Sequence, residues 1–163
     1  MTLSTHLVIA AATTIALVPV TDATARTATP PAQLQRVLVA EMNSVRADHA
    51  LPPLRRAASL TRAAQSHSRN LVRRGVLSHE GPHGEPFWTR LVAAGFPRTR
   101  AMAENIAQVP GCGAAAMRRT VRMWMASPVH RANLLSSRYR QVGAGAACAM
   151  RPGLAMVTAD YGA

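Results

Sequence analysis

Three polar segments of this sequence carry side chains that can do chemistry. They contain His79, Glu104 and His130, with Glu80 and Ser127 close beside two of them. Two imidazoles and a carboxylate form a reasonable ligand set for zinc or another divalent cation, with a coordination position left open for water. Without a metal, Glu104 could raise the pKa of a neighbouring histidine and hold it as a general base.

The first of these segments is a loop. Residues 76–86 are rich in Gly and Pro, which interrupt regular structure. The loop is also the densest cluster of titratable groups in the chain, with His79, Glu80, His83 and Glu85. Loops that a rigid scaffold positions are where binding and catalytic sites are usually built, so we expect this loop to contribute to a cleft.

Other interpretations of the same residues stay open. Ser78 or Ser127 beside a histidine could be a nucleophile, but no Gly-x-Ser-x-Gly motif is present and Ser127 is better explained as a helix cap. The His/Glu cluster could instead only cross-link loops through hydrogen bonds. His67 lies on an apolar helix face, which favours a buried histidine bonded to the backbone.

Apolar residues at helical spacing predict four helices. They cover about residues 32–50, 59–74, 87–94 and 114–126, and a short fifth helix follows Ser127, with Pro128 at its first position. Ser59 is the expected N-cap of the second helix. Gly75 is its expected C-terminal residue.

Strand patterns come last in the chain. Residues 142–148 alternate small and apolar side chains, residues 151–153 form a turn, and residues 154–161 form a second strand. Residues 103–109 are predicted to be extended or a single turn. Helices first and strands last indicate an α+β fold, with the helices packed on a small antiparallel sheet that ends in a β-hairpin.

The N-terminus has the features of an export signal. Residues 7–20 are apolar but too short to span a membrane, and Ala23-Thr24-Ala25 is a small-x-small cleavage site. We expect residues 1–25 to be a signal peptide, residues 26–31 a mobile leader and residues 32–163 one domain. The protein would then be secreted, extracellular or periplasmic, with no transmembrane segment in the mature chain; an uncleaved N-terminal anchor is the alternative.

The composition is strongly basic. The formal net charge is +12, and all 19 basic residues are arginine. Such a charge attracts anionic surfaces, including acidic wall polymers, lipid head groups and nucleic acid. Specific nucleic-acid binding is not expected, because the chain has only two each of Trp, Tyr and Phe and so lacks the aromatic platforms of single-strand readers.

The chain contains two cysteines, Cys112 and Cys148. An even number of cysteines in an exported protein favours a disulfide over a metal site. We expect these two to be bonded to each other.

Several motifs together resemble a known family. In chain order they are Asn43-x-x-Arg46, residues 51–54, 77–79, 103–107, 124–135 and 142–145. Their order and spacing are similar to those of a bacterial secreted CAP domain, also called SCP, which is related to cysteine-rich secretory and pathogenesis-related proteins. The resemblance covers nearly all of the expected mature chain.

The resemblance implies an α-β-α sandwich with a central cleft lined by two histidines and two acids, which hold zinc in some members. His79, Glu104 and His130 match three of these positions. The second acid is missing, because this chain has Met125-Ala126-Ser127 where a Glu is expected. Glu80, Glu85 or a water molecule could take its place.

Two functions remain open at this point. One is a secreted, monomeric binding module whose cleft holds a divalent metal, a small apolar ligand or a wall component. The alternative is an extracellular hydrolase that depends on His79, Glu104 and His130, with or without a metal. A fold does not fix a function, so the resemblance does not decide between them.

Overall fold

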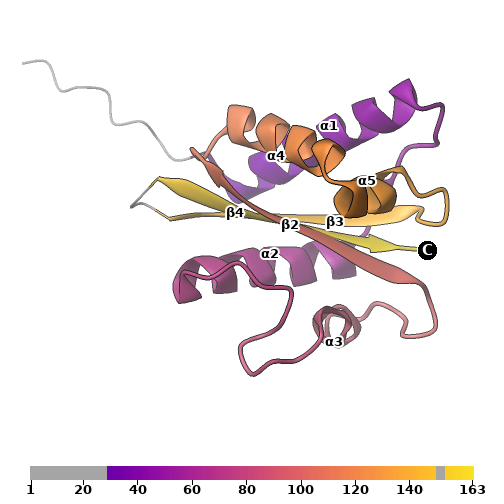
Figure 1. The fold of residues 1–163 in the computed structure, drawn as a ribbon. Coiled ribbons are helices and arrows are strands. Elements are labelled where there is room, and N and C mark those ends of the chain that lie inside the picture. The colour runs from indigo at the N-terminus through magenta and orange to yellow at the C-terminus, as the bar shows by residue number, and fades with distance from the viewer. Residues whose placement is uncertain (1–28, 150–152) are drawn as a thin grey trace, which may run out of the picture.

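The computed structural model describes residues 29–149 and 153–163, so the expected signal peptide and the first half of the expected leader lie outside the described residues. The chain forms three layers (Figure 1), with α1, α4 and α5 on one face of a sheet and α2 and α3 on the other. This arrangement confirms the α-β-α sandwich. The helices are α1 (Pro31–Asp48), α2 (Ala58–Arg74), α3 (Phe87–Ala93), α4 (Ala114–Ala126) and α5 (Pro128–Leu135).

The helix boundaries follow the local chemistry closely. Gly75 closes α2 in the left-handed conformation, at φ 66°, as its position predicted. The N-cap of α2 is Ala57, so the prediction of Ser59 was wrong by two residues. Ser127 is the N-cap of α5 and Pro128 its first residue, but the Ser127 side chain makes no capping hydrogen bond.

The sheet has four strands in the order β1-β3-β4-β2. They are β1 (Arg55–Arg56), β2 (Met102–Pro110), β3 (Gln141–Ala149) and β4 (Leu154–Gly162). β3 and β4 form the predicted hairpin, and β2 extends the antiparallel part from β4. The sheet is mixed rather than purely antiparallel, because β1 pairs with β3 in parallel. Two arginines are too short a segment to give a strand pattern.

Two glycines let α2 lie directly on β3. A Cβ atom on Gly143 would collide with the backbone of Leu60, and one on Gly145 with the backbone of Ala64. The alternating glycines of β3 are therefore required by the close approach of a helix. This contact fixes α2, and with it the loop that carries His79.

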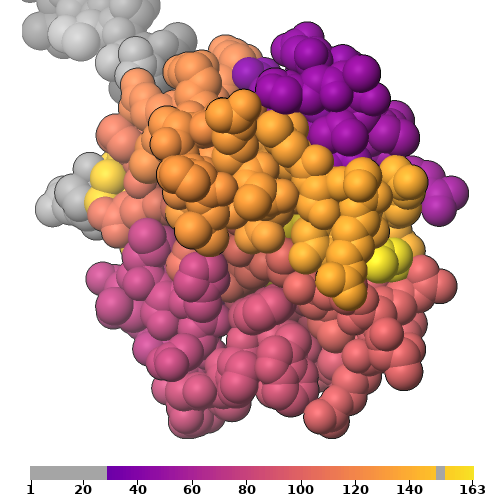
Figure 2. Space-filling model, turned by 45° about the vertical axis from the view of Figure 1, so that its right-hand side comes forward, coloured from indigo at the N-terminus to yellow at the C-terminus, as the bar shows by residue number. Residues whose placement is uncertain are grey.

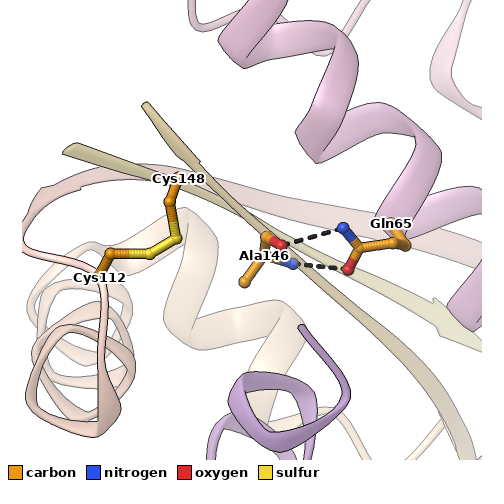
Figure 3. Close-up of a disulfide and its surroundings, with 4 residues drawn as sticks. All are labelled: Gln65, Cys112, Ala146 and Cys148. Atoms are coloured by element: carbon orange, nitrogen blue, oxygen red, sulfur yellow. Dashed lines mark hydrogen bonds between the residues drawn. A yellow bond between two sulfur atoms is a disulfide. The ribbon is translucent and has the colours of Figure 1, made fainter. Parts of the chain in front are cut away.

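Side chains satisfy part of the open edge of β3 beyond β1. Gln65 of α2 donates from Nε2 to Ala146 O at 2.9 Å, and Ala146 N donates back to Gln65 Oε1 at 3.2 Å (Figure 3). Near this edge, Cys148 is bonded to Cys112 with a Cα–Cα distance of 5.8 Å, inside the range for disulfides. The predicted disulfide is confirmed.

The two faces of the sheet carry different side chains. Val157, Ala159 and Tyr161 of β4 pack into the large apolar core under α1 and α4. The alternate residues face α2, since Thr158 accepts a hydrogen bond from Ser68 of that helix at 3.0 Å. Strand alternation therefore directs the remaining polar residues of this face toward α2 and α3.

No helix among residues 29–149 and 153–163 is both long and apolar enough to cross a membrane.

Candidate functional site

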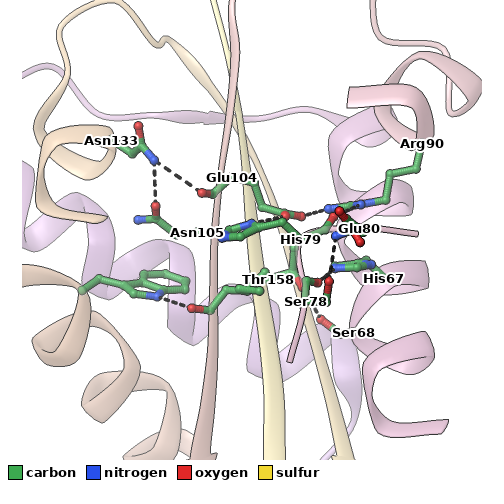
Figure 4. A network of polar contacts seen from close by, with 12 residues as sticks. His67, Ser68, Ser78, His79, Glu80, Arg90, Glu104, Asn105, Asn133 and Thr158 are labelled. Atoms are coloured by element: carbon green, nitrogen blue, oxygen red, sulfur yellow. Dashed lines mark hydrogen bonds and ion pairs between the residues drawn. The ribbon is translucent and has the colours of Figure 1, made fainter. Parts of the chain in front are cut away.

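His79 and Glu104 form the centre of the site. His79 Nδ1 lies 2.7 Å from Glu104 Oε1, and the two residues come from the α2–α3 loop and from β2 (Figure 4). The Glu104 side chain is 1% exposed, whereas that of His79 is 52% exposed. A buried carboxylate thus fixes the orientation of a ring that remains open to solvent.

Arg90 of α3 completes this cluster. Its Nη2 pairs with Glu104 Oε2, and its Nη1 donates to the carbonyl oxygen of His79 at 2.9 Å. Both carboxylate oxygens of Glu104 are therefore engaged, one by an imidazole and the other by a guanidinium. Charge-assisted bonds of this kind are among the strongest side-chain interactions in proteins.

The electrostatic surroundings favour a neutral His79. Burial and then the positive charge of Arg90 lower its pKa, while the charge of Asp160 acts in the opposite direction. The net shift is therefore downward, opposite to the increase that Glu104 was expected to cause. A neutral ring that donates Nδ1–H to Glu104 presents an unprotonated Nε2 to solvent.

His130 lies in α5, on the other side of the edge strand β2. Its Nδ1 is 2.9 Å from Ser127 Oγ, so Ser127 orients His130 instead of capping the helix. Burial, and secondarily the charge of His79 when its ring is protonated, lower the pKa of His130. Figure 2 shows α4 and α5, in orange, bordering the pink surface of the segment that holds the α2–α3 loop and α3.

A buried amide network fixes α5 against β2. Asn105 donates from Nδ2 to His130 O at 2.9 Å and to Tyr161 Oη at 3.1 Å. Asn133 donates to Asn105 Oδ1 at 2.9 Å (Figure 4). Trp124 of α4 donates to the carbonyl of Ile106 at 3.2 Å. These bonds place His130 at the edge of β2.

His67 is a buried histidine that supports the loop, as its place on an apolar face predicted. It is 2% exposed, and its Nε2 lies 2.9 Å from Ser78 O. Burial is the largest cause that lowers its pKa to about 4, and the charge of Arg90 adds to this. His67 therefore stays neutral and anchors the residue that precedes His79.

The other acids of the loop do not reach the cluster. Glu80 bonds through its backbone N–H to Ser78 Oγ at 3.1 Å. Glu85 accepts the N–H of His83 at 2.9 Å, and hydrogen bonds from backbone groups lower its pKa. Neither takes the place of the second acid that the resemblance implied.

Asp160 is an acid of the site that sequence reasoning missed. It lies opposite Glu104 in the pairing of β2 with β4. It is fully buried, and neither of its carboxyl oxygens has a hydrogen-bond partner among the described residues. Burial raises its pKa to about 7, although the charge of Arg90, and that of His79 when protonated, act to lower it.

Asp160 was detectable from the sequence, and Arg90 was not. An aspartate within the otherwise apolar run 154–161 is a local conflict, because a buried carboxyl needs compensation. Arg90 gave no such signal, since one arginine among 19 in this chain does not stand out.

The residues present do not fit a preformed metal centre. Within residues 29–149 and 153–163, no group of three or more His, Cys, Asp or Glu side chains is arranged to hold a metal ion. The structure brings His79 and Glu104 together, but it pairs His130 with Ser127 and gives the second oxygen of Glu104 to Arg90. The expected set His79, Glu104 and His130 is not assembled as metal ligands.

A cavity of about 410 Å³ adjoins the cluster, between α2 and α3. Arg90 lines it, so the guanidinium that pairs with Glu104 also borders this space. The other lining residues are mostly polar: Ser66, His67, Asn70, Arg73, Gly81, Pro82, Glu85, Thr89 and Ala93. Hydroxyl, amide and guanidinium groups from both helices can thus reach one ligand.

Comparisons with known proteins agree with this architecture. An outer surface protein from Borrelia burgdorferi has a similar structure, with TM-score 0.66, 18% identity, and 78% of this chain and 90% of that chain covered. An extracellular protein with an SCP domain from Bacillus anthracis gives TM-score 0.67 and 22% identity over 80% of this chain, which spans only 40% of that protein.

A third similar structure is that of NaASP2 with Zn²⁺, with TM-score 0.50, 11% identity, and 84% of this chain and 82% of that chain covered. At these identities the likeness shows the fold alone. No curated protein matches this chain in sequence. The profile of the cysteine-rich secretory protein family, called CAP, matches residues 39–161. The chain therefore belongs to the cysteine-rich secretory protein family.

Proposed function

We propose that this protein is an extracellular binding module that takes an anionic group, a carboxylate or a phosphate, in the cavity between α2 and α3. The observation that carries the proposal is the cavity lining, which holds the guanidinium of Arg73 on α2 together with hydroxyl and amide groups. On the opposite helix only Nε of Arg90 remains without a partner, because Nη1 and Nη2 bind His79 O and Glu104. Guanidinium groups bind carboxylates and phosphates through paired N–H donors.

Two further features support an anionic partner, and the carboxylate of Glu85, which also lines the cavity, is already engaged by the N–H of His83. Ser66, Asn70 and Thr89 supply hydrogen-bonding groups to the cavity, which a purely apolar ligand would leave unpaired. The chain has a net charge of +12, which accelerates encounters with polyanions. An acidic polymer of the cell wall combines both properties. The family and the expected signal peptide support an extracellular location.

The test is calorimetric titration with two oligomers of matched charge, a poly(glycerol phosphate) and an oligogalacturonate. Arg73→Ala removes a donor that lines the cavity and should weaken binding about tenfold, since a charge-assisted contact contributes on the order of 1.5 kcal/mol. Arg138→Ala is the matched control, because Arg138 is exposed and does not line the cavity. Equal losses of affinity in the two variants would show that binding is only non-specific electrostatic attraction.

A hydrolase is the second candidate, favoured by the 2.7 Å contact of His79 with Glu104. A carboxylate that orients an imidazole is an arrangement found in general-base catalysis. Among the described residues, however, no serine or cysteine side chain hydrogen-bonds to the ring of His79. The base would have to act on a water molecule. Hydrolysis of a chromogenic ester or peptide that His79→Ala abolishes would establish this activity, and unchanged turnover would dismiss it.

A further inference from the structure

The buried cluster behind His79 contains two acids and one strong base. Glu104 and Asp160 lie opposite each other on β2 and β4, 5% and 0% exposed. Directly opposite residues of an antiparallel pair have Cβ atoms about 5 Å apart. Two carboxyls that close, away from water, cannot both ionise without a cation beside them.

The side chain that meets this requirement is Arg90. Its Nη2 pairs directly with Glu104 Oε2, and its Nη1 is held by the carbonyl of His79. Its positive charge also acts on Asp160. Burial lowers the pKa of Arg90, yet an arginine keeps its charge in proteins. Figure 4 shows the Arg90 side chain reaching from α3 to the carboxylate of Glu104.

His79 does not supply this positive charge. Its side chain is 52% exposed and, unlike a guanidinium, carries no permanent charge, whereas the Arg90 side chain is 16% exposed. His67, which faces the same cluster from α2, is also neutral, with its pKa lowered to about 4. The guanidinium is thus the one permanent cation among the side chains named in this cluster.

We propose that Arg90 is the permanent cation of this buried cluster. Its guanidinium occupies the place beside Glu104 and Asp160 that a divalent metal ion would otherwise take. Glu104, Asp160 and His79 would then be a latent ligand set of two carboxylates and one imidazole, a combination that suits zinc. The guanidinium of Arg90 prevents this set from binding a metal ion, because it pairs with Oε2 of Glu104. The proposal concerns residues on β2, β4 and α3 and does not depend on the anion cavity.

The test is zinc titration by calorimetry of the wild type and of Arg90→Met, which keeps the length and apolar volume of the side chain but not its charge. The wild type should give no stoichiometric binding. Arg90→Met should bind one zinc at least tenfold more tightly, and zinc should raise its melting temperature. Arg90→Lys, which retains a cation, should behave like the wild type.

A folded Arg90→Met protein that binds zinc no better than the wild type would overturn the proposal. Adding Asp160→Asn to Arg90→Met should remove the gained binding, and gained binding that persists would also contradict it. If Arg90→Met does not fold, zinc titration of the wild type is the deciding measurement. If the wild type binds zinc stoichiometrically and Glu104→Gln abolishes that binding, the proposal is overturned. If the wild type binds no zinc, the proposal is supported.

Discussion

Arg46 of α1 donates a 2.8 Å hydrogen bond from Nη1 to the carbonyl oxygen of Leu134, 88 residues later in the chain. The same nitrogen donates to Ser136 O at 2.9 Å, and Nε donates to Pro52 O at 2.9 Å. Arg46 is fully buried. It satisfies carbonyls at the C-terminal end of α5, where a helix leaves acceptors without partners, and so ties the helix that carries His130 to α1.

Arg46→Met should therefore destabilise the fold by about 3 kcal/mol, because buried carbonyls left without donors cost about 1–3 kcal/mol each and partial hydration recovers some of this. Urea unfolding of the two proteins measures the change. Arg46→Lys keeps the charge but not the planar fork of donors, and we expect an intermediate loss. A loss below about 1 kcal/mol in Arg46→Met would show that these bonds matter little.

The close contact of α2 with β3 makes a second prediction. Gly145→Ala places a methyl group against the backbone of Ala64, which cannot move without displacing α2. The expected destabilisation is about 2–3 kcal/mol, the usual cost of overpacking. Gly113→Ala is the control, since Gly113 has no atom within 4 Å of an added Cβ. Because Gly113 is the N-cap of α4, where glycine is preferred to alanine, its replacement should cost at most about 1 kcal/mol.

Equal effects in the two glycine variants would indicate that the loss of glycine itself, and not the clash, determines stability.

Much of the fold was predictable because the apolar periodicity is strong in the helices and in the final hairpin. Ser127 shows where local reasoning stops. Its position before Pro128 correctly predicted the start of α5, but its hydroxyl pairs with His130. Whether a side chain caps a helix or orients a neighbour depends on which partner tertiary packing brings near, and one segment of sequence does not contain this information.

The candidate site was predictable to a similar extent. The pairing of His79 with Glu104 follows from two motifs in separate segments. The packing of α3 brings Arg90 to Glu104. The pairing of β2 with β4 places Asp160 opposite Glu104. Strand register is a long-range property, since a shift of one residue would turn Asp160 to the other face.

His67 should make stability depend on pH. Its folded pKa is about 4, below its ordinary value of 6.5, so the unfolded chain binds the proton more tightly. Stability from this residue is fully present above about pH 6.5 and is lost as the pH falls toward 4. The expected loss is roughly 2 kcal/mol, discounted from the full shift for solvent screening.

His67→Gln removes the titration while keeping a polar side chain that can donate to Ser78 O. Urea unfolding of both proteins between pH 4 and pH 7 should therefore give a less positive slope of stability against pH in the variant. Comparing the slopes cancels the contribution of Asp160, whose raised pKa acts with the opposite sign over the same range. Identical slopes would mean that His67 titrates normally in the folded protein.

The disulfide gives the last prediction. Cys112 and Cys148 are separated by 36 residues and join the segment before α4 to the end of β3. In the chain-entropy model a loop of this length contributes about 3–4 kcal/mol, because the bond restricts the unfolded chain. Reduction should lower the free energy of unfolding by that amount while leaving the native fold in place, since α1, α4 and the sheet share one apolar core.

The measurement is urea unfolding with and without reductant, with free thiols counted to confirm that the bond is broken. The double variant Cys112→Ser with Cys148→Ser is the matched control. Its stability should equal that of the reduced wild type and should not change when reductant is added. If the wild type keeps its full stability after reduction has exposed both thiols, the bond does not stabilise the fold by restricting the unfolded chain. The expectation from loop entropy would then fail for this protein.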